Sequence, residues 1–282
     1  MRRRRIWCET LPLRELPLDL LASCEVAPLV AVRPWDLDAL AYVVDRCAAC
    51  GLPFGVWPML DDAEGRWANT DDMSRFVAFA REVRRVAPRA ELVVDLEPPI
   101  AELRRAVRLG PLPFLHEALG RARRFAEARA ELLLLVEEAR ADGVPTSAAV
   151  LPNVLFEPTA LPLTQALLGT PSDGIPFDHV SVMLYPSILE GWSRGLLDRA
   201  RTVHALGFLA RATRRRFGAR GGVSLGVVGP GALGNEPCYR DAAELAEDVA
   251  VTRAAGIDDL ALFDVGGVLR RSGAFLAAFT GL

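Results

Sequence analysis

Short apolar runs alternate with longer amphipathic stretches along the whole chain. The short runs are rich in valine, leucine and isoleucine, as in strands that a parallel sheet buries on both faces. The longer stretches repeat apolar residues three and four positions apart, which predicts helices that pack by one face. The pattern predicts strands over Ile6–Glu9, Leu29–Val32, Phe54–Leu60, Leu92–Glu97, Ser147–Leu151, Val180–Tyr185, Val223–Val228 and Leu260–Phe263.

Helices are expected between these strands, at Asp36–Cys50, Asp71–Val86, Phe114–Ala141, Leu196–Phe217 and Tyr239–Ala255, whereas Leu11–Ala27 has no clear pattern. Eight strands that alternate with helices predict an α/β fold of the (β/α)8 TIM barrel type, and 282 residues is near the length of about 250 typical of that fold. We expect one domain over residues 1–282. The alternative is an open doubly wound sheet, but the glycine-rich segment 226–231 fits no nucleotide-binding fingerprint.

Composition narrows the possible partners. Hydrophobic residues make up 51% and charged residues 24% of the chain, which suits a packed core. The net charge of −3 gives no field that would attract nucleic acid, and no apolar run approaches the ~20 residues of a membrane span. The arginine-rich start resembles a signal peptide, but Glu9, Arg14, Glu15 and Asp19 interrupt any apolar segment, so we expect a cytoplasmic protein. Five scattered cysteines suit reduced thiols.

The residue types limit the chemistry. All 33 Lys+Arg positions are arginine, which excludes Schiff-base and pyridoxal-phosphate enzymes and any lysine general base. His116 and His204 fall in predicted helices and His179 begins a strand, so a serine–histidine–aspartate triad or a histidine-rich metal centre has little material. Cys47 and Cys50 could form half a zinc site, but no second pair completes it. We expect no cofactor and a chemistry of carboxylates, tyrosine and backbone.

Two carboxylates end the fourth predicted strand. Asp95 and Glu97 lie two positions apart, so both side chains point to the same side of the strand. Pro98 keeps Glu97 extended at the carboxyl end, where α/β barrels place their ligands. Two acids buried together do not ionise equally, so we expect a raised pKa at Glu97 and a proton donor near neutral pH. The plainer alternative is a polar pair satisfied by an arginine.

Other strand ends carry acids and aromatic rings, a combination that suits a sugar. Rings stack on the apolar faces of pyranoses, and carboxylates bind hydroxyl groups. The candidate ligand-binding residues at the strand ends are Glu9, Trp57, Asp61, Asn153, Tyr185, Phe263 and Asp264.

Two segments resemble family 18 glycoside hydrolases, the chitinases and endo-β-N-acetylglucosaminidases. Val-Val-Asp-Leu-Glu-Pro-Pro around Asp95 is similar to the end of the family's Asp-x-x-Asp-x-Asp-x-Glu signature, and Met183-Leu184-Tyr185 to its sixth strand. Phe263 stands where the family commonly has a tryptophan. The resemblance implies a barrel in which Glu97 is the general acid and Asp95 orients the substrate's 2-acetamido group. It also implies that Tyr185 hydrogen-bonds this group and that hydrolysis is substrate-assisted and retaining.

The match is degenerate. Ala90 and Val93 replace the two upstream signature aspartates, and Pro186 replaces the usual aspartate after Tyr185. One alternative is therefore a barrel that binds a glycan without cleaving it. Another is a retaining hydrolase of the large barrel clan, which requires a nucleophile after strand seven, where Glu236 is the nearest acid. A third is a Mg²⁺ site of Asp95, Glu97 and Asp264.

Overall fold

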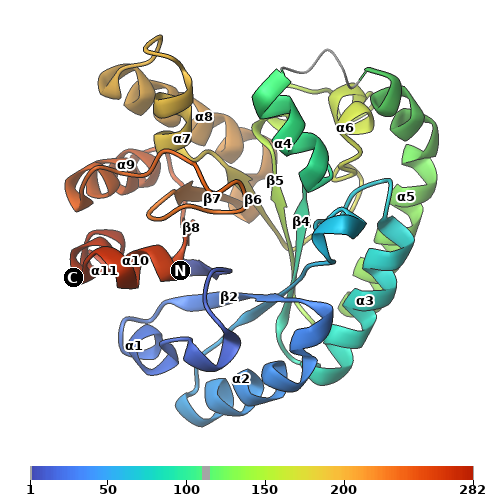
Figure 1. Ribbon diagram of the computed structural model, residues 1–282, viewed down its shortest axis with the longest axis horizontal. Coiled ribbons are helices and arrows are strands. Elements are labelled where there is room, and N and C mark those ends of the chain that lie inside the picture. Colours follow the sequence, from blue (N-terminus) through green and yellow to red (C-terminus); the bar gives the residue numbers. More distant parts are fainter. Residues whose placement is uncertain (1, 110–114, 282) are drawn as a thin grey trace. The chain divides into compact units, whose positions relative to one another are not determined.

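A computed structural model describes residues 2–109 and 115–281, except for the side chains of 106–109, 115 and 116. Eight strands form a closed barrel in which they follow one another in chain order (Figure 1), and every pairing described is parallel. The predicted (β/α)8 barrel is confirmed. The strands are β1 (Arg3–Cys8), β2 (Ala27–Val32), β3 (Gly55–Pro58), β4 (Glu91–Leu96), β5 (Thr146–Val150), β6 (His179–Met183), β7 (Gly221–Gly226) and β8 (Asp259–Phe263).

The helices alternate with the strands, and several are short. They are α1 (Leu18–Ser23), α2 (Leu37–Cys50), α3 (Met73–Val86), α4 (Ile100–Leu109), α5 (Leu115–Ala141), α6 (Leu163–Leu168), α7 (Pro186–Trp192), α8 (Arg199–Phe217), α9 (Ala242–Ala254), α10 (Val265–Arg271) and α11 (Gly273–Thr280). Short 3₁₀ helices complete the connections: η1 (Leu13–Glu15), η2 (Pro34–Asp36), η3 (Asp62–Glu64), η5 (Pro152–Leu155) and η6 (Gly218–Arg220). No helix in the described part of the chain is long and apolar enough to cross a membrane.

The strands end earlier than the hydrophobic pattern predicts. β1, β4 and β6 stop before Glu9, Glu97 and Tyr185, which were placed inside the strands and instead follow them. β3 likewise ends at Pro58, two residues short of the prediction. Met59 and Leu60 remain buried after β3, so the apolar pattern continues although the strand has ended.

The chain divides into two compact units. The first unit comprises Met1–Val30, Asp45–Phe54 and Val180–Leu282, and the second comprises Ala31–Val44 and Gly55–His179. Each unit has its own buried apolar residues, such as Leu225 and Leu262 in the first and Leu92 and Leu132 in the second. The single domain over residues 1–282 stays a prediction.

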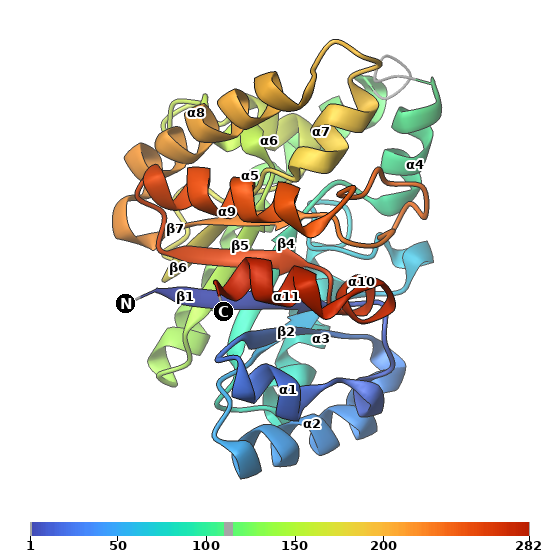
Figure 2. The ribbon, with the colours of Figure 1, turned by 90° about the vertical axis from the view of Figure 1, so that its left-hand side faces the viewer.

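The first unit buries polar groups among its strands. Arg5 of β1 donates to both carboxylate oxygens of Asp259 on β8, at 2.8 and 2.7 Å. The Trp7 indole N–H donates to Ser224 Oγ at 3.2 Å, and Ser224 shares a 2.9 Å hydrogen bond with Ser181. These bonds satisfy groups that burial would otherwise penalise. Outside the strands, α8, α9 and α11 lie side by side (Figure 2).

The second unit packs α3 against α5, the longest described helix (Figure 1). Arginines on α3 meet acids near the end of α5: Arg81 forms a two-bond ion pair with Glu138 at 2.9 and 2.6 Å, and Arg84 reaches Asp142 at 2.6 Å. Behind them, β4 pairs with β3 on one side and β5 on the other, and all six of its residues are buried.

The thiols of the first unit differ in exposure. Cys8 ends β1 with no exposed surface, Cys47 on α2 is 1% exposed, and Cys50 is exposed. Burial raises the pKa of Cys8 well above its usual value, and burial raises the pKa of Cys47 to about 12. Both buried thiols are therefore protonated at neutral pH. Cys47 and Cys50 lie late in a helix, as predicted.

Candidate active site

Asp95 lies at the carboxyl end of β4 and is only 3% exposed. On one side of the strand, Asp95 lies opposite Ala149 of β5. The segment that follows β3 returns to the same strand end, where Ala68 forms a parallel bridge with Leu96. There the Ala68 N–H donates to the Asp95 carbonyl oxygen at 3.0 Å. The position of Asp95 is thus fixed by three neighbouring segments.

The electrostatics of Asp95 favour its protonated form. Its Oδ1 atom has no hydrogen-bond partner among the described residues. Burial raises the pKa of Asp95 well above its usual value, and the charge of Glu97 raises it further, while the guanidinium of Arg66 acts in the opposite direction. The pair therefore holds a proton to a higher pH than an exposed aspartate does. The sequence assigned the raised pKa to Glu97, and that assignment stays a prediction.

Glu97 directly follows β4 and is half-buried. Pro98 and Pro99 come next, and α4 begins at Ile100, so Glu97 stands between the strand and the helix. Its charge acts on Asp95, as expected for two acids on the same side of one strand end. Glu97 is partly exposed and is therefore more accessible to a ligand than Asp95 is.

Arg66 is part of this neighbourhood and was missed by the sequence reasoning. Its backbone is left-handed, with φ of 69°, and the residue is 7% exposed. The guanidinium donates to Asp62 Oδ1 at 2.6 Å and lies 5.4 Å from the ring centroid of Trp67. An arginine near the acids fits the plainer alternative, yet it leaves Oδ1 of Asp95 without a hydrogen bond.

The connection from β3 to α3 carries Arg66 and Trp67 to the end of β4. A turn at Gly65, with φ of 92°, reverses the chain, and the Leu60 N–H then donates to the Arg66 carbonyl at 2.9 Å. Trp67 is 3% exposed, and its Nε1 has no partner among the described residues. Gly65 was a readable turn signal, but nothing local in the sequence indicates the return to β4.

The other candidates in the second unit have structural contacts. Trp57 is buried in β3 at 2% exposure. Asp61 caps η3 by accepting from the Ala63 N–H at 2.8 Å. Asn153, in η5, donates through Nδ2 to Thr164 Oγ1 at 2.7 Å, while its Oδ1 lacks a partner within the described chain. Asn153 thus keeps one acceptor atom without a hydrogen bond from the described residues.

Tyr185 and Phe263 come together in the first unit. Their ring centroids are 5.9 Å apart, with an interplanar angle of 59°. Gly226 makes room for this contact, since a Cβ there would lie 3.1 Å from Tyr185 Cδ1. Tyr185 is half-buried, whereas Phe263 and Met183 are 7% and 5% exposed. Two of the candidate residues are therefore neighbours, and Met183 stands at the end of β6.

Asp264 is bound by its own chain. It is fully buried, its Oδ1 accepts from the Gly267 N–H at 2.9 Å, and its Oδ2 accepts from Thr10 Oγ1 at 2.5 Å. These bonds cap the start of α10. Glu9, the other strand-end acid of this unit, is half-buried.

Glu236, the nucleophile candidate of the large barrel clan, accepts hydrogen bonds from the backbone of its own loop. Its carboxylate accepts from the Gly231 N–H at 3.1 Å and from the Leu233 N–H at 2.7 Å. Both oxygens are thereby engaged, which weighs against that alternative. For the Mg²⁺ alternative, the described residues contain no group of three or more His, Cys, Asp or Glu that could hold a metal ion.

Comparison with known proteins identifies the fold. No protein-family model and no curated protein matches the chain. The glycoside hydrolase domain of PgaB (BpsB) from Bordetella bronchiseptica superposes with a TM-score of 0.59 at 13% identity, covering 99% of this chain and 98% of that one. A fungal β-1,4-galactanase gives 0.57 at 11% identity over 100% of both chains. The catalytic domain of a Pyrococcus furiosus chitinase gives 0.55 at 13% identity, over 100% of this chain and 95% of that one. At such identities the similarity is one of fold.

Proposed function

We propose that this protein is a glycoside hydrolase that acts on an N-acetylated glycan, with Glu97 as the general acid and Asp95 as its partner. The observation that carries the proposal is the buried Asp95, whose pKa is raised and whose Oδ1 has no partner in the described chain, next to the more accessible Glu97. This pair stands at the carboxyl end of a barrel strand, the usual position of catalytic residues in (β/α)8 enzymes. The solved glycoside hydrolases of the same fold support it.

In the proposed reaction the proton held by the pair first passes from Asp95 to Glu97, which leaves Asp95 ionised. Glu97 then transfers this proton to the glycosidic oxygen, while the bond from that oxygen to the anomeric carbon breaks. The carbonyl oxygen of the substrate's 2-acetamido group bonds to the anomeric carbon from the opposite face, and Asp95 orients its N–H. Water then attacks the anomeric carbon and gives a proton to the Glu97 carboxylate, while the bond from the anomeric carbon to the acetamido oxygen breaks and the acetamido group is restored. The two inversions retain the anomeric configuration, without an enzyme nucleophile.

The remaining roles come from the family resemblance. Tyr185 hydrogen-bonds the acetamido group, and Phe263 supplies an apolar ring for a sugar face. Trp57, Asp61, Asn153, Met183, Asp264 and Glu9 complete the proposed substrate-binding set. Within it, the bonds of Asp61 and Asp264 to their own backbone support an indirect role that holds loops in place.

A second candidate is a barrel that binds the glycan without cleaving it. The observation that favours it is Val93, which lies two residues before Asp95 and is 1% exposed. Family 18 enzymes have an aspartate at this position, and a buried valine cannot pass a proton to Asp95. Both candidates share the ligand class and differ in turnover.

The test compares wild type with Glu97→Gln on aryl N-acetylglucosaminide oligomers and on plain aryl glucosides. Loss of a general acid should lower kcat by about 10²–10⁴-fold, with an unchanged melting temperature. The matched control is Glu137→Gln, the same chemical change at an exposed position on α5, which should leave turnover unaffected.

Two results would overturn the hydrolase proposal. Equal turnover by wild type and Glu97→Gln would remove Glu97 as the acid. No turnover by wild type, together with measurable binding of the oligomers, would establish the binding-only candidate. Faster cleavage of plain glucosides than of N-acetylated substrates would exclude the substrate-assisted route, because glucosides have no acetamido oxygen to attack the anomeric carbon.

A further inference from the structure

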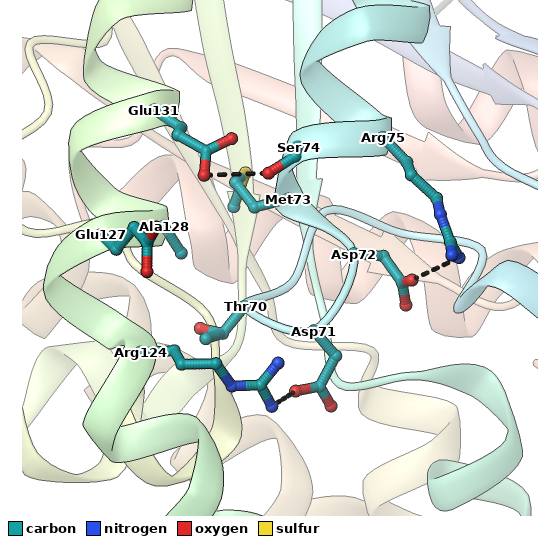
Figure 3. A pocket seen from close by; sticks show the side chains of 10 residues that line it. All are labelled: Thr70, Asp71, Asp72, Met73, Ser74, Arg75, Arg124, Glu127, Ala128 and Glu131. Atoms are coloured by element: carbon teal, nitrogen blue, oxygen red, sulfur yellow. Dashed lines mark hydrogen bonds and ion pairs between the residues drawn. The ribbon is translucent and has the colours of Figure 1, made fainter.

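A pocket of about 230 Å³ lies in the second unit between the start of α3 and one face of α5 (Figure 3). The segment 70–75 forms one wall, and α5 residues between 124 and 131 form the other. This volume is below the usual range of drug-sized pockets, so it fits a small molecule or one residue of a longer one. Its lining is rich in charged side chains.

The charges in the pocket do not balance. Asp71 is paired with Arg124 at 2.5 Å, and Asp72 with Arg75 at 3.2 Å. The two remaining acids, Glu127 and Glu131, have no ion-pair partner in the part of the chain that the structure describes.

The unpaired acids lie one helical turn apart on α5, an arrangement of like charges that destabilises a helix. Glu131 accepts a hydrogen bond from Ser74 Oγ at 2.9 Å, which partly satisfies it without supplying positive charge. The pocket thus presents two negative charges on one wall.

Thr70 provides a second, independent indication of a ligand. It is 6% exposed, and its Oγ1 has no hydrogen-bond partner among the described residues. It lines the pocket, and Figure 3 shows its side chain in the space between α3 and α5. A buried hydroxyl left without a hydrogen bond is unfavourable, and a ligand donor or acceptor would satisfy it.

We propose that this pocket binds a small organic cation with a primary ammonium group, held by Glu127 and Glu131 together with the hydroxyls of Ser74 and Thr70. An ammonium group offers three N–H donors, which suits carboxylate and hydroxyl acceptors. A metal ion fits less well, since no described cluster of three or more His, Cys, Asp or Glu could hold one. The proposal does not depend on hydrolase activity.

The state of Asp72 is consistent with a cationic ligand. Burial raises the pKa of this carboxyl, and the charges of Asp71 and Glu64 raise it further, whereas Arg75 lowers it. A positive charge bound nearby would stabilise the ionised carboxylates of the pocket wall.

The experiment measures binding to the full chain by calorimetry and by NMR shifts of α5 amides. The probes are glucosamine, its neutral counterpart N-acetylglucosamine, and 1,4-diaminobutane. We expect ammonium probes to shift the α5 amides and N-acetylglucosamine to leave them unchanged, with affinity at this pocket falling as salt rises. Binding of glucosamine alone identifies an amino sugar as the ligand, and binding of the diamine alone identifies a polyamine.

The variants locate the site. Glu127→Gln combined with Glu131→Gln should weaken ammonium binding by about tenfold, and Thr70→Val by about threefold. Glu137→Gln, on the same helix outside the pocket, should change nothing. Glu127→Gln alone, at an exposed position, serves if the double variant does not fold.

Three results would each overturn the proposal: equal shifts of the α5 amides by glucosamine and N-acetylglucosamine, no shift of these amides by any ammonium probe, or unchanged shifts in the double variant. None of these results would affect the hydrolase test, which depends on Glu97 and on turnover.

Discussion

Asp95 is a carboxyl group held away from water, and its ionised form has no hydrogen bond at Oδ1 from the described residues. Burying such a charge is costly, so the group binds a proton instead. Arg66 lowers the cost only in part, because its guanidinium also donates to Asp62. Strongly shifted pKa values are common at functional sites, so this property supports the role proposed for Asp95.

Asp95 should make the protein less stable as pH rises. The unfolded carboxyl loses its proton near pH 3.9, while the folded one keeps it to a higher pH, so the folded state binds more protons over that interval. The free energy of unfolding of wild type relative to Asp95→Asn should therefore fall between pH 4 and the higher folded pKa. Urea titrations at several pH values measure it, with exposed Asp142→Asn as the control. A constant difference would contradict the raised pKa.

Two substitutions test whether Asp264 acts as a helix cap. Asp264→Ala removes the acceptor for Gly267 N–H and for Thr10 Oγ1, and should destabilise the protein by about 1–3 kcal/mol. Asp264→Asn keeps an oxygen acceptor and should cost less. Denaturant unfolding of both variants measures the difference. Loss of ligand binding at unchanged stability would instead support direct contact with substrate.

At the scale of elements, α8 and α9 are joined by a buried polar cluster. Asp248 on α9 is fully buried and accepts from Arg199 on α8 at 2.8 Å and from the Tyr239 hydroxyl at 2.8 Å. Burial raises the pKa of Asp248 despite both partners. The carboxylate therefore depends on Arg199 to remain charged.

Arg199→Ala should destabilise the protein by about 3–5 kcal/mol, because it leaves a buried acid without its cation. Tyr239→Phe removes one hydrogen bond and should cost about 1 kcal/mol. Thermal and urea unfolding compare the two. Equally small losses of stability in both variants would mean that water or another group takes the place of Arg199 beside Asp248.

The sequence predicted the strands because each is a short, buried run rich in branched side chains, as in Leu92–Val94 of β4. It predicted the long helices for a similar reason, since their apolar residues recur at helical spacing. The short helices were missed: α10 contains Gly266 and Gly267, poor helix formers, and its capping by Asp264 depends on Thr10, far away in the chain.

The sequence predicted those candidate site residues that lie at the ends of strands. Asp95 and Glu97 follow from strand alternation and the barrel rule, and Phe263 from its place at the end of β8. Arg66 and Trp67 could not be predicted, since only the long-range bridge between Ala68 and Leu96 brings them there. Likewise, burial of Asp264 is a tertiary property that a strand-end acid does not reveal.

At the scale of the whole molecule, the absence of lysine has an electrostatic consequence. Every described side-chain ion pair joins an arginine to an aspartate or glutamate. Arginine stays protonated throughout the alkaline range in which lysine titrates. The surface charge and these ion pairs should therefore persist to higher pH than in proteins that use lysine.

The buried thiols Cys8 and Cys47 allow a further measurement on the intact chain. Only an exposed thiolate reacts with alkylating reagents. Because both groups are buried and protonated, each can react only after a local opening of the structure exposes it. We expect exposed Cys50 to react at least about 10³-fold faster. Mass spectrometry of labelled peptides resolves the three rates, and rapid labelling of Cys8 would contradict its burial. The labelling times would give the lifetime of the closed state at β1 and at α2 separately, and so reveal whether strand and helix open together or one at a time.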